Sequence, residues 1–148
     1  MTLYPANEPI IMKTVPWEDM PFGGLGDWHE EGDITLIRTP IFEDIDPYLA
    51  WLYGRFIKIH ELYEDTLRRV AGIPEDVVNA FCMVCGDEGS DDPASPIYHE
   101  HQRASVPERL AAEFCRVKWS DYDGYTARFA KRKERDRLNA RDQYGGEV

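Results

Sequence analysis

The stretch that decides the fold is DPYLAWLYGRFIKIHELYEDTLRRVAG, residues 46–72. Asp46 is a favourable N-cap, Pro47 a favourable first helical residue, and Gly72 typical of the position just past a helix end. These signals predict a helix over 47–71, about 37 Å long. The first half is apolar on most sides and the second half keeps one apolar stripe, so we expect the helix to begin inside and end at the surface.

Three more helices are predicted after this one. Pro74 opens a helix that runs to Cys85, where Gly86 stops it. Ser105, with Glu108 three residues later, has the spacing of a capping box and predicts the start of a third helix. Ser120 starts a fourth in the same way, and residues 142–148 are expected to fray at its end.

The first 40 residues are divided into short pieces by prolines and glycines. Two β-prone runs remain, over 10–15 and 34–37, and they favour a small ribbon packed on the long helix. The predicted fold is a single α+β domain over 1–148 with about four helices. It has an irregular or β part over 1–40, a helical part over 41–141 and a frayed tail over 142–148.

Composition places the chain among ordinary globular proteins, with 148 residues and 43% hydrophobic residues. We find no run of 18 apolar residues and no secretory signal, so neither a membrane partner nor export is expected. Three cysteines without an export signal favour reduced thiols, which predicts a cytoplasmic location.

Charge is distributed unevenly. Residues 1–100 carry 20 acidic and 6 basic side chains, whereas residues 101–148 carry a net charge of +3. A negative excess repels phosphate backbones and argues against direct binding of duplex nucleic acid, so a protein partner with a basic surface is expected. The basic run over 128–141 is interpreted as pairing within the helix or with the acidic body, the alternative being phosphate contact along one helix face.

Two acidic segments, both expected to be loops, are the candidate contacts for that partner. The first covers 27–33 and the second 86–92, and the residues are Asp27, Glu30, Glu31, Asp33, Asp87, Glu88, Asp91 and Asp92. The sequence shows no complete catalytic motif. We therefore expect a non-enzymatic inhibitor or adaptor that binds a nucleic-acid-handling enzyme or a toxin, with nucleic-acid mimicry as one route. This interpretation requires the carboxylates to face outward.

The alternative is a zinc-dependent hydrolase or nuclease. Two cysteines in a Cys-x-x-Cys pattern are followed by two histidines and a third cysteine, giving Cys82, Cys85, His99, His101 and Cys115 as candidate ligands. Thiolate and imidazole suit tetrahedral zinc, structural or catalytic. The favoured interpretation of Cys82 and Cys85, which lie among Val and Phe of a predicted helix, is that they are small buried residues of the core. His60 and Glu64, four residues apart on the long helix, are interpreted as a surface pair.

The segment Cys82–Gly86 followed by Tyr98–His101 resembles HNH-type nucleases, which place a zinc-binding pair before a histidine-containing ββα unit. The resemblance covers about 35 residues. It implies that His99 or His101 activates water beside a divalent ion. The chain departs from that pattern at three points: no Asp precedes His99, no second cysteine pair follows, and no clear downstream Asn or His completes the motif.

Overall fold

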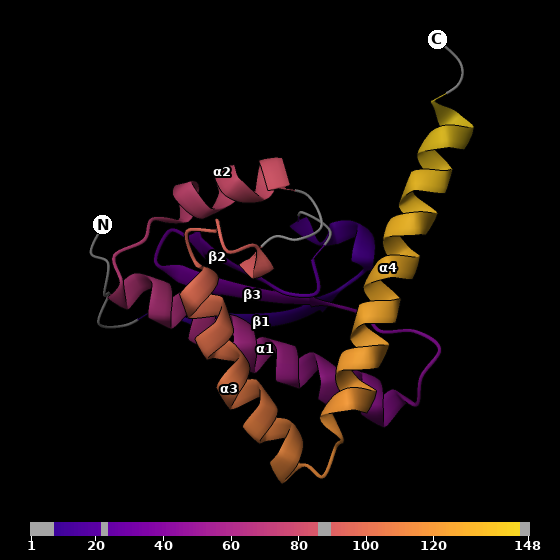
Figure 1. Cartoon of the computed structure of the whole chain (residues 1–148), viewed down its shortest axis with the longest axis horizontal. Coiled ribbons are helices and arrows are strands. Elements are labelled where there is room, and N and C mark those ends of the chain that lie inside the picture. Colours follow the sequence, from indigo (N-terminus) through magenta and orange to yellow (C-terminus); the bar gives the residue numbers. More distant parts are fainter. Residues whose placement is uncertain (1–7, 22–23, 86–89, 146–148) are drawn as a thin grey trace.

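The computed structural model of the chain describes residues 8–21, 24–85 and 90–145. Its described strands are β1 (Ile10–Val15), β2 (Asp27–Glu31) and β3 (Ile34–Pro40), and a short 3₁₀ helix covers Trp17–Asp19. The described helices are α1 (Pro47–Val70), α2 (Glu75–Cys85), α3 (Tyr98–Phe114) and α4 (Trp119–Tyr144). The fold is α+β and mostly helical, with a small three-stranded sheet at the N-terminal end, as predicted (Figure 1).

The sheet has the order β1-β3-β2. β1 pairs with β3 in parallel, and β2 pairs with β3 antiparallel. The expectation of a loop over 27–33 is therefore wrong, because five of these residues form β2 and a tight turn leads directly into β3. Gly32 occupies that turn with φ +62°, a conformation that glycine adopts without the steric cost of a side chain.

The long helix begins where the sequence predicts. The Asp46 side chain accepts hydrogen bonds from the backbone N–H groups of Tyr48 and Leu49, at 2.9 and 3.3 Å. The helix ends at Val70, one residue earlier than predicted, and Gly72 follows in the left-handed region with φ +73°. Both ends of α1 therefore come from local signals.

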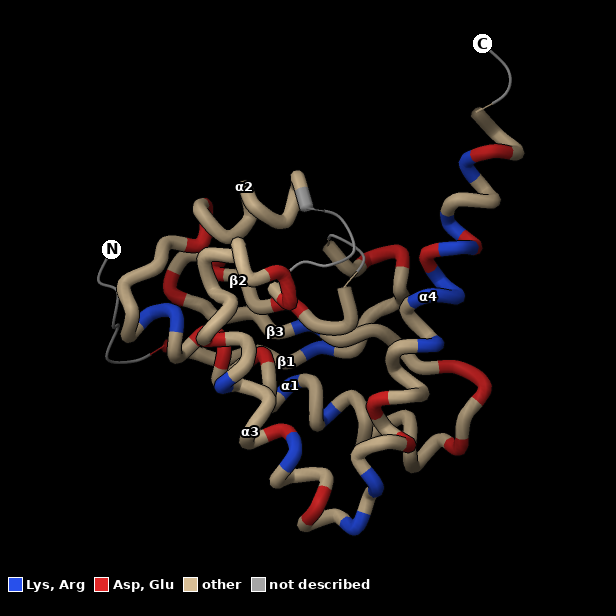
Figure 2. The backbone as a smooth tube through the Cα atoms, in the orientation of Figure 1, with Lys and Arg blue, Asp and Glu red and all other residues tan. Residues whose placement is uncertain are grey.

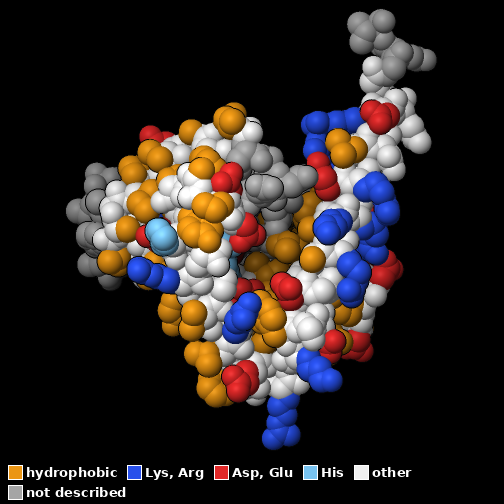
Figure 3. Space-filling view, viewed as in Figure 1, with side chains coloured by type: hydrophobic (Ala, Val, Ile, Leu, Met, Phe, Trp, Pro, Cys, Tyr) orange, Lys and Arg blue, Asp and Glu red, His pale blue; other side chains and the backbone are white. Residues whose placement is uncertain are grey.

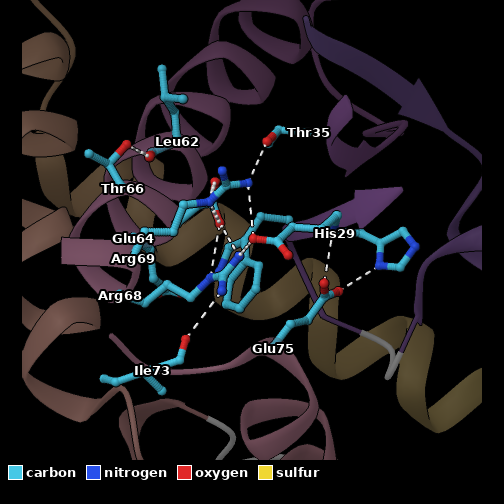
Figure 4. A network of polar contacts seen from close by, with 12 residues as sticks. His29, Thr35, Leu62, Glu64, Thr66, Arg68, Arg69, Ile73 and Glu75 are labelled. Atoms are coloured by element: carbon cyan, nitrogen blue, oxygen red, sulfur yellow. Dashed lines mark hydrogen bonds and ion pairs between the residues drawn. The ribbon is translucent and has the colours of Figure 1, made fainter. Parts of the chain in front are cut away.

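The burial of α1 does not decrease along the helix as predicted, because both halves contain buried residues. Trp51, in the apolar first half, is 54% exposed, whereas polar and charged side chains of the second half are buried. These buried residues are His60, Glu61, Glu64, Asp65, Arg68 and Arg69. They can be buried because most of them have charged partners: Arg68, 1% exposed, donates to Asp65 and Glu30 and lies over the ring of Trp28 (Figure 4).

Hydrophobic residues form two clusters that hold α1 in place. The larger one joins α1 to α3 and α4, and its buried members are Trp17, Phe42, Leu52, Tyr53, Phe56, Ile57, Ala112, Tyr122 and Phe129. The smaller one joins the sheet to α2 and contains Trp28, Ile37, Val78 and Ile97. The polar half of α1 lies beside the smaller cluster, since Trp28 hydrogen-bonds to Glu64.

α3 begins at Tyr98, seven residues before Ser105, so the prediction that Ser105 caps the start of this helix is wrong. The Ser105 hydroxyl donates instead to the carbonyl of His101, one turn back, at 3.3 Å. Ala104, Glu108 and Ala112 form a buried stripe at intervals of four residues on α3. Two small residues in that stripe allow α3 to cross α1 closely, as Figure 1 shows.

α4 starts one residue before Ser120 and continues to Tyr144, so the frayed tail predicted from residue 142 is helical over its first three residues. Residues 146–148 lie outside the described part of the chain. Only Tyr122, Thr126 and Phe129 of this helix are buried, and its C-terminal part extends away from the rest of the molecule (Figure 1). None of the described helices is long and apolar enough to cross a membrane.

Candidate functional site

Three side chains from two helices converge at the crossing of α1 and α3. His60 and Glu64 occupy neighbouring turns of α1, and His101 comes from the first turn of α3. The Nε2 atom of His60 lies 3.1 Å from Oε2 of Glu64 and 3.0 Å from Nδ1 of His101. The Nδ1 atom of His101 lies 2.6 Å from the same Glu64 oxygen. These three atoms form a compact triangle of metal-ligand type.

The outward atom of each of the three residues has its own partner. Nδ1 of His60 lies 2.9 Å from Oε1 of Glu108, and Nε2 of His101 lies 3.1 Å from Oδ1 of Asp91. Oε1 of Glu64 accepts a hydrogen bond of 2.8 Å from the Trp28 indole. Metal-ligating histidines usually have such a carboxylate on the second nitrogen, where it fixes the tautomer and the ring orientation.

The tautomers set by these partners have an electrostatic consequence. A carboxylate only accepts, so a neutral ring that donates to Glu108 or Asp91 presents a bare lone pair to the triangle, whereas a protonated ring donates to Glu64 as well. With both rings neutral, two bare nitrogens and a carboxylate oxygen about 3 Å apart repel each other. A cation at the centre of the triangle, either a proton or a metal ion, removes that repulsion.

The titration behaviour of the metal-free site is consistent with a proton in that place. Burial disfavours the charged form of His60, but hydrogen bonds to Glu108 and Glu64 outweigh it and raise the pKa of His60 to about 11. Burial acts against ionisation of Glu64 too, yet the hydrogen bonds with His101 and His60 lower its pKa to about 2. An imidazolium and a carboxylate therefore coexist here over the ordinary pH range.

Glu61 is a fourth polar residue beside the triangle. It follows His60 in α1, is only 8% exposed, and forms no hydrogen bond with any described residue. Burial and the neighbouring charge of Glu64 raise the pKa of its carboxyl group well above the usual value. Gly26 covers the Glu61 carboxylate so closely that a side chain at position 26 would overlap it.

Among the described residues, the predicted zinc ligands do not meet in one place. Only His101 belongs to the triangle. His99 is exposed two residues earlier, and Cys115 is exposed just past the other end of α3, about 20 Å from His101 by helix rise. Cys82 packs against the smaller hydrophobic cluster, as the core alternative expected, and the side chain of Cys85 lies outside the described residues.

His60, Glu64 and Glu61 are the site residues that sequence reasoning missed. The interpretation of His60 and Glu64 as a surface pair is wrong, because both side chains are buried. The signal was present as His60-Glu61-x-x-Glu64, where positions one and five lie on the same helix face. It resembles the His-Glu-x-x-His pattern of zinc peptidases with a carboxylate in the second ligand position.

The predicted partner-binding carboxylates lie in different environments in the structure. Asp27 pairs with Arg38 at 2.6 Å and Glu30 with Arg68 at 2.5 Å, so both are engaged within the molecule. Burial outweighs Arg38 and raises the pKa of Asp27. Glu31, Asp33 and Asp91 are exposed, and Asp92 is partly buried. Asp87 and Glu88 lie outside the described residues.

No family model, curated protein or solved structure matches this chain.

Proposed function

We propose that this chain is a metal-dependent hydrolase that binds one zinc ion through His60, Glu64 and His101. The observation that carries the proposal is the convergence of three possible ligand atoms, each in a side chain whose outward atom contacts another residue. Such outward contacts are typical of metal-ligating histidines. In the neutral rings that donate to Glu108 and Asp91, the inward atoms are all acceptors, which is what a cation site requires.

Zinc is the ion that this ligand set suits best. Two imidazoles and one carboxylate form the protein shell of one class of catalytic zinc sites, where the fourth position holds water. Tetrahedral ligands at about 2.0–2.1 Å from zinc lie about 3.3 Å apart. The present spacings of 2.6–3.1 Å therefore need to widen by about 0.2–0.7 Å. The same ligands also hold ferrous iron in other proteins, and metal analysis separates the two ions.

Glu61 supplies the proton transfer in this proposal. A zinc ion held by His60, Glu64 and His101 would supply Lewis-acid activation of water. The Glu61 carboxylate would accept the proton that this water loses and pass it to the leaving group, which balances the reaction. The geometry that supports this role is a buried carboxylate next to the first ligand with no hydrogen bond to any described residue.

Metal binding is tested on the whole chain, stripped with a chelator and titrated with zinc. We expect one zinc per chain for the unmodified protein and a loss of at least 100-fold in affinity for His101→Ala. The matched control is His99→Ala, which removes an exposed histidine from the same helix. Cys115→Ala also keeps the ion if the proposal is right. Equal losses in His99→Ala and His101→Ala, or no stoichiometric zinc, would refute the site.

Hydrolysis is tested with zinc-loaded protein on activated carboxylate esters and on a phosphodiester, both with a chromogenic leaving group. The variant Glu61→Gln is expected to bind zinc as tightly as the unmodified chain and to lose 10²–10⁴-fold in rate. Glu113→Gln, an exposed change on α3, is the control. Zinc binding without turnover, or turnover that Glu61→Gln leaves unchanged, would contradict the catalytic part of the proposal while leaving the metal site intact.

A further inference from the structure

The basic residues of this acidic protein are concentrated on α4. Residues 128–141 contain seven basic and two acidic side chains, whereas the remainder of the chain has a net charge of −16. Figure 2 shows the blue segments gathered along this helix. Arg128, Lys131, Arg132 and Arg135 fall within an arc of about 100° and span about 10 Å along the axis. We call these four residues the α4 stripe.

Much of the charge on the stripe is not neutralised within the molecule. Arg132 pairs with Asp44 at 3.0 Å, and Arg135 approaches Asp136 only to 3.8 Å. Arg128 and Lys131 are exposed and form no ion pair with any described residue. The Nη2 atom of Arg132 is buried without a hydrogen-bond partner in the described part of the chain. The expectation that the basic run pairs within the helix or with the acidic body therefore holds for Arg132, Lys133 and Arg137. It fails for Arg128 and Lys131.

The stripe borders an open hollow of about 530 Å³. The side chains that line it are Asp44, Tyr125, Arg128, Phe129, Lys131, Arg132 and Arg135. Beyond this point α4 extends into solvent without support from the core, and Figure 3 shows its cations along the surface of that extension. A helix in this situation offers one continuous face to a long anionic ligand.

We propose that the α4 stripe binds the phosphate backbone of single-stranded nucleic acid. A stacked single strand, with the rise of about 3.4 Å per nucleotide that one strand has in B-DNA, places about three phosphates beside a 10 Å stripe. A duplex is disfavoured because its second strand and wider outline would face the acidic remainder of the surface, including Asp44 beside the stripe. A single strand follows the one cationic face and avoids most of that repulsion.

The experiment measures binding of a fluorescently labelled 20-nucleotide single strand by anisotropy, with a chelator present throughout. The chelator makes the result independent of the zinc site, so the two proposals can fail separately. We expect log Kobs to fall with log salt with a slope of about −2, as three phosphate contacts to a single strand require. The double variant Arg128→Glu with Lys131→Glu is expected to weaken binding at least tenfold.

The matched control reverses two exposed cations on other elements, Lys13→Glu on β1 and Arg103→Glu on α3. This control variant changes the net charge by the same amount as the stripe variant. It is expected to retain at least a third of the affinity of the unmodified chain for the single strand. No binding at 50 mM salt, equal losses in the two double variants, or tighter binding of the matching duplex would overturn the proposal. Salt-sensitive self-association that is abolished only in the stripe variant would overturn it too, because the occupant would then be a second copy.

Discussion

Gly26 lies directly against the carboxylate of Glu61, and a methyl group at position 26 would overlap the side chain from Oε1 to Cγ. Gly26 directly precedes β2, and Glu61 is on the buried face of α1. The absence of a side chain at position 26 therefore allows the segment before β2 to cover a buried acid beside the three converging ligands. This contact links the N-terminal sheet to the candidate site.

Gly26→Ala is expected to destabilise the fold by about 1–3 kcal/mol, because the new methyl group must displace a packed side chain. Chemical denaturation measures the change. The control is Gly24→Ala, whose methyl group would be 3.4 Å from its nearest neighbour, the carbonyl oxygen of Gly26. The second change Glu61→Ala should recover most of the loss in the Gly26→Ala background. Failure of that rescue would show that the strain lies in the backbone at position 26.

Arg68→Met and Arg55→Met form a matched pair on α1, since each guanidinium lies over a tryptophan ring, at 4.2 and 4.7 Å. Arg68 is buried, and its loss removes a partner from the buried Asp65, so we expect a cost of about 3–5 kcal/mol. Arg55 is exposed, and its replacement should cost at most about 1 kcal/mol. Urea unfolding of the two variants provides the comparison. Similar losses would mean that the ring contact outweighs the buried ion pairs.

Glu108→Gln tests the role of the outward partner of His60. Glu108 faces Nδ1 of His60 through one oxygen and accepts from the Tyr122 hydroxyl through the other, at 2.5 Å. An amide cannot accept on both sides, so His60 loses its fixed tautomer and zinc affinity is expected to fall 10–100-fold. Isothermal titration measures the affinity. Tyr122→Phe keeps the carboxylate on His60 and should have a smaller effect; a larger one would assign Glu108 a packing role instead.

The stability of the metal-free protein should depend on pH through His60. Its pKa is raised from 6.5 to about 11 in the folded state, so its contribution is fully present below pH 6.5 and is lost as pH rises toward 11. The difference in unfolding free energy between the unmodified chain and His60→Gln should therefore shrink steadily across that range. Denaturation in a chelator at half-unit pH intervals checks this. A difference that stays constant between pH 7 and 10 would contradict a stably protonated His60.

The contribution of Glu64 to the stability of the metal-free protein has the opposite pH dependence to that of His60, because it is lost as the pH falls. The pKa of Glu64 is lowered to about 2, so its contribution is complete above pH 4.5 and is lost as the pH falls through 2. The contribution of Glu64 is measured as the difference in unfolding free energy between the unmodified chain and Glu64→Gln over pH 2–5. We expect the stability difference to decrease toward pH 2, and an increase in that direction would contradict the paired geometry.

The sequence by itself determined the local elements and the fold class. Asp46, Pro47 and Gly72 act within a few residues of themselves, so the ends of α1 follow from neighbouring backbone groups alone. The β-prone runs before residue 40 likewise became β1 and part of β3. β2 was missed because its sequence, with three acidic residues around Trp28 and His29, is also typical of an exposed loop. Pairing with β3 decides between the two.

Only the tertiary structure decided which polar residues are buried and which of them meet. Periodicity assigns polar residues to the surface, yet His60 and Glu64 are buried because His101, Glu108 and Trp28 supply their partners. His101 is 41 residues away from His60 in the chain, so no local pattern joins them. A buried charge is stable only beside its partners, and the packing of α3 across α1 is what brings those partners together.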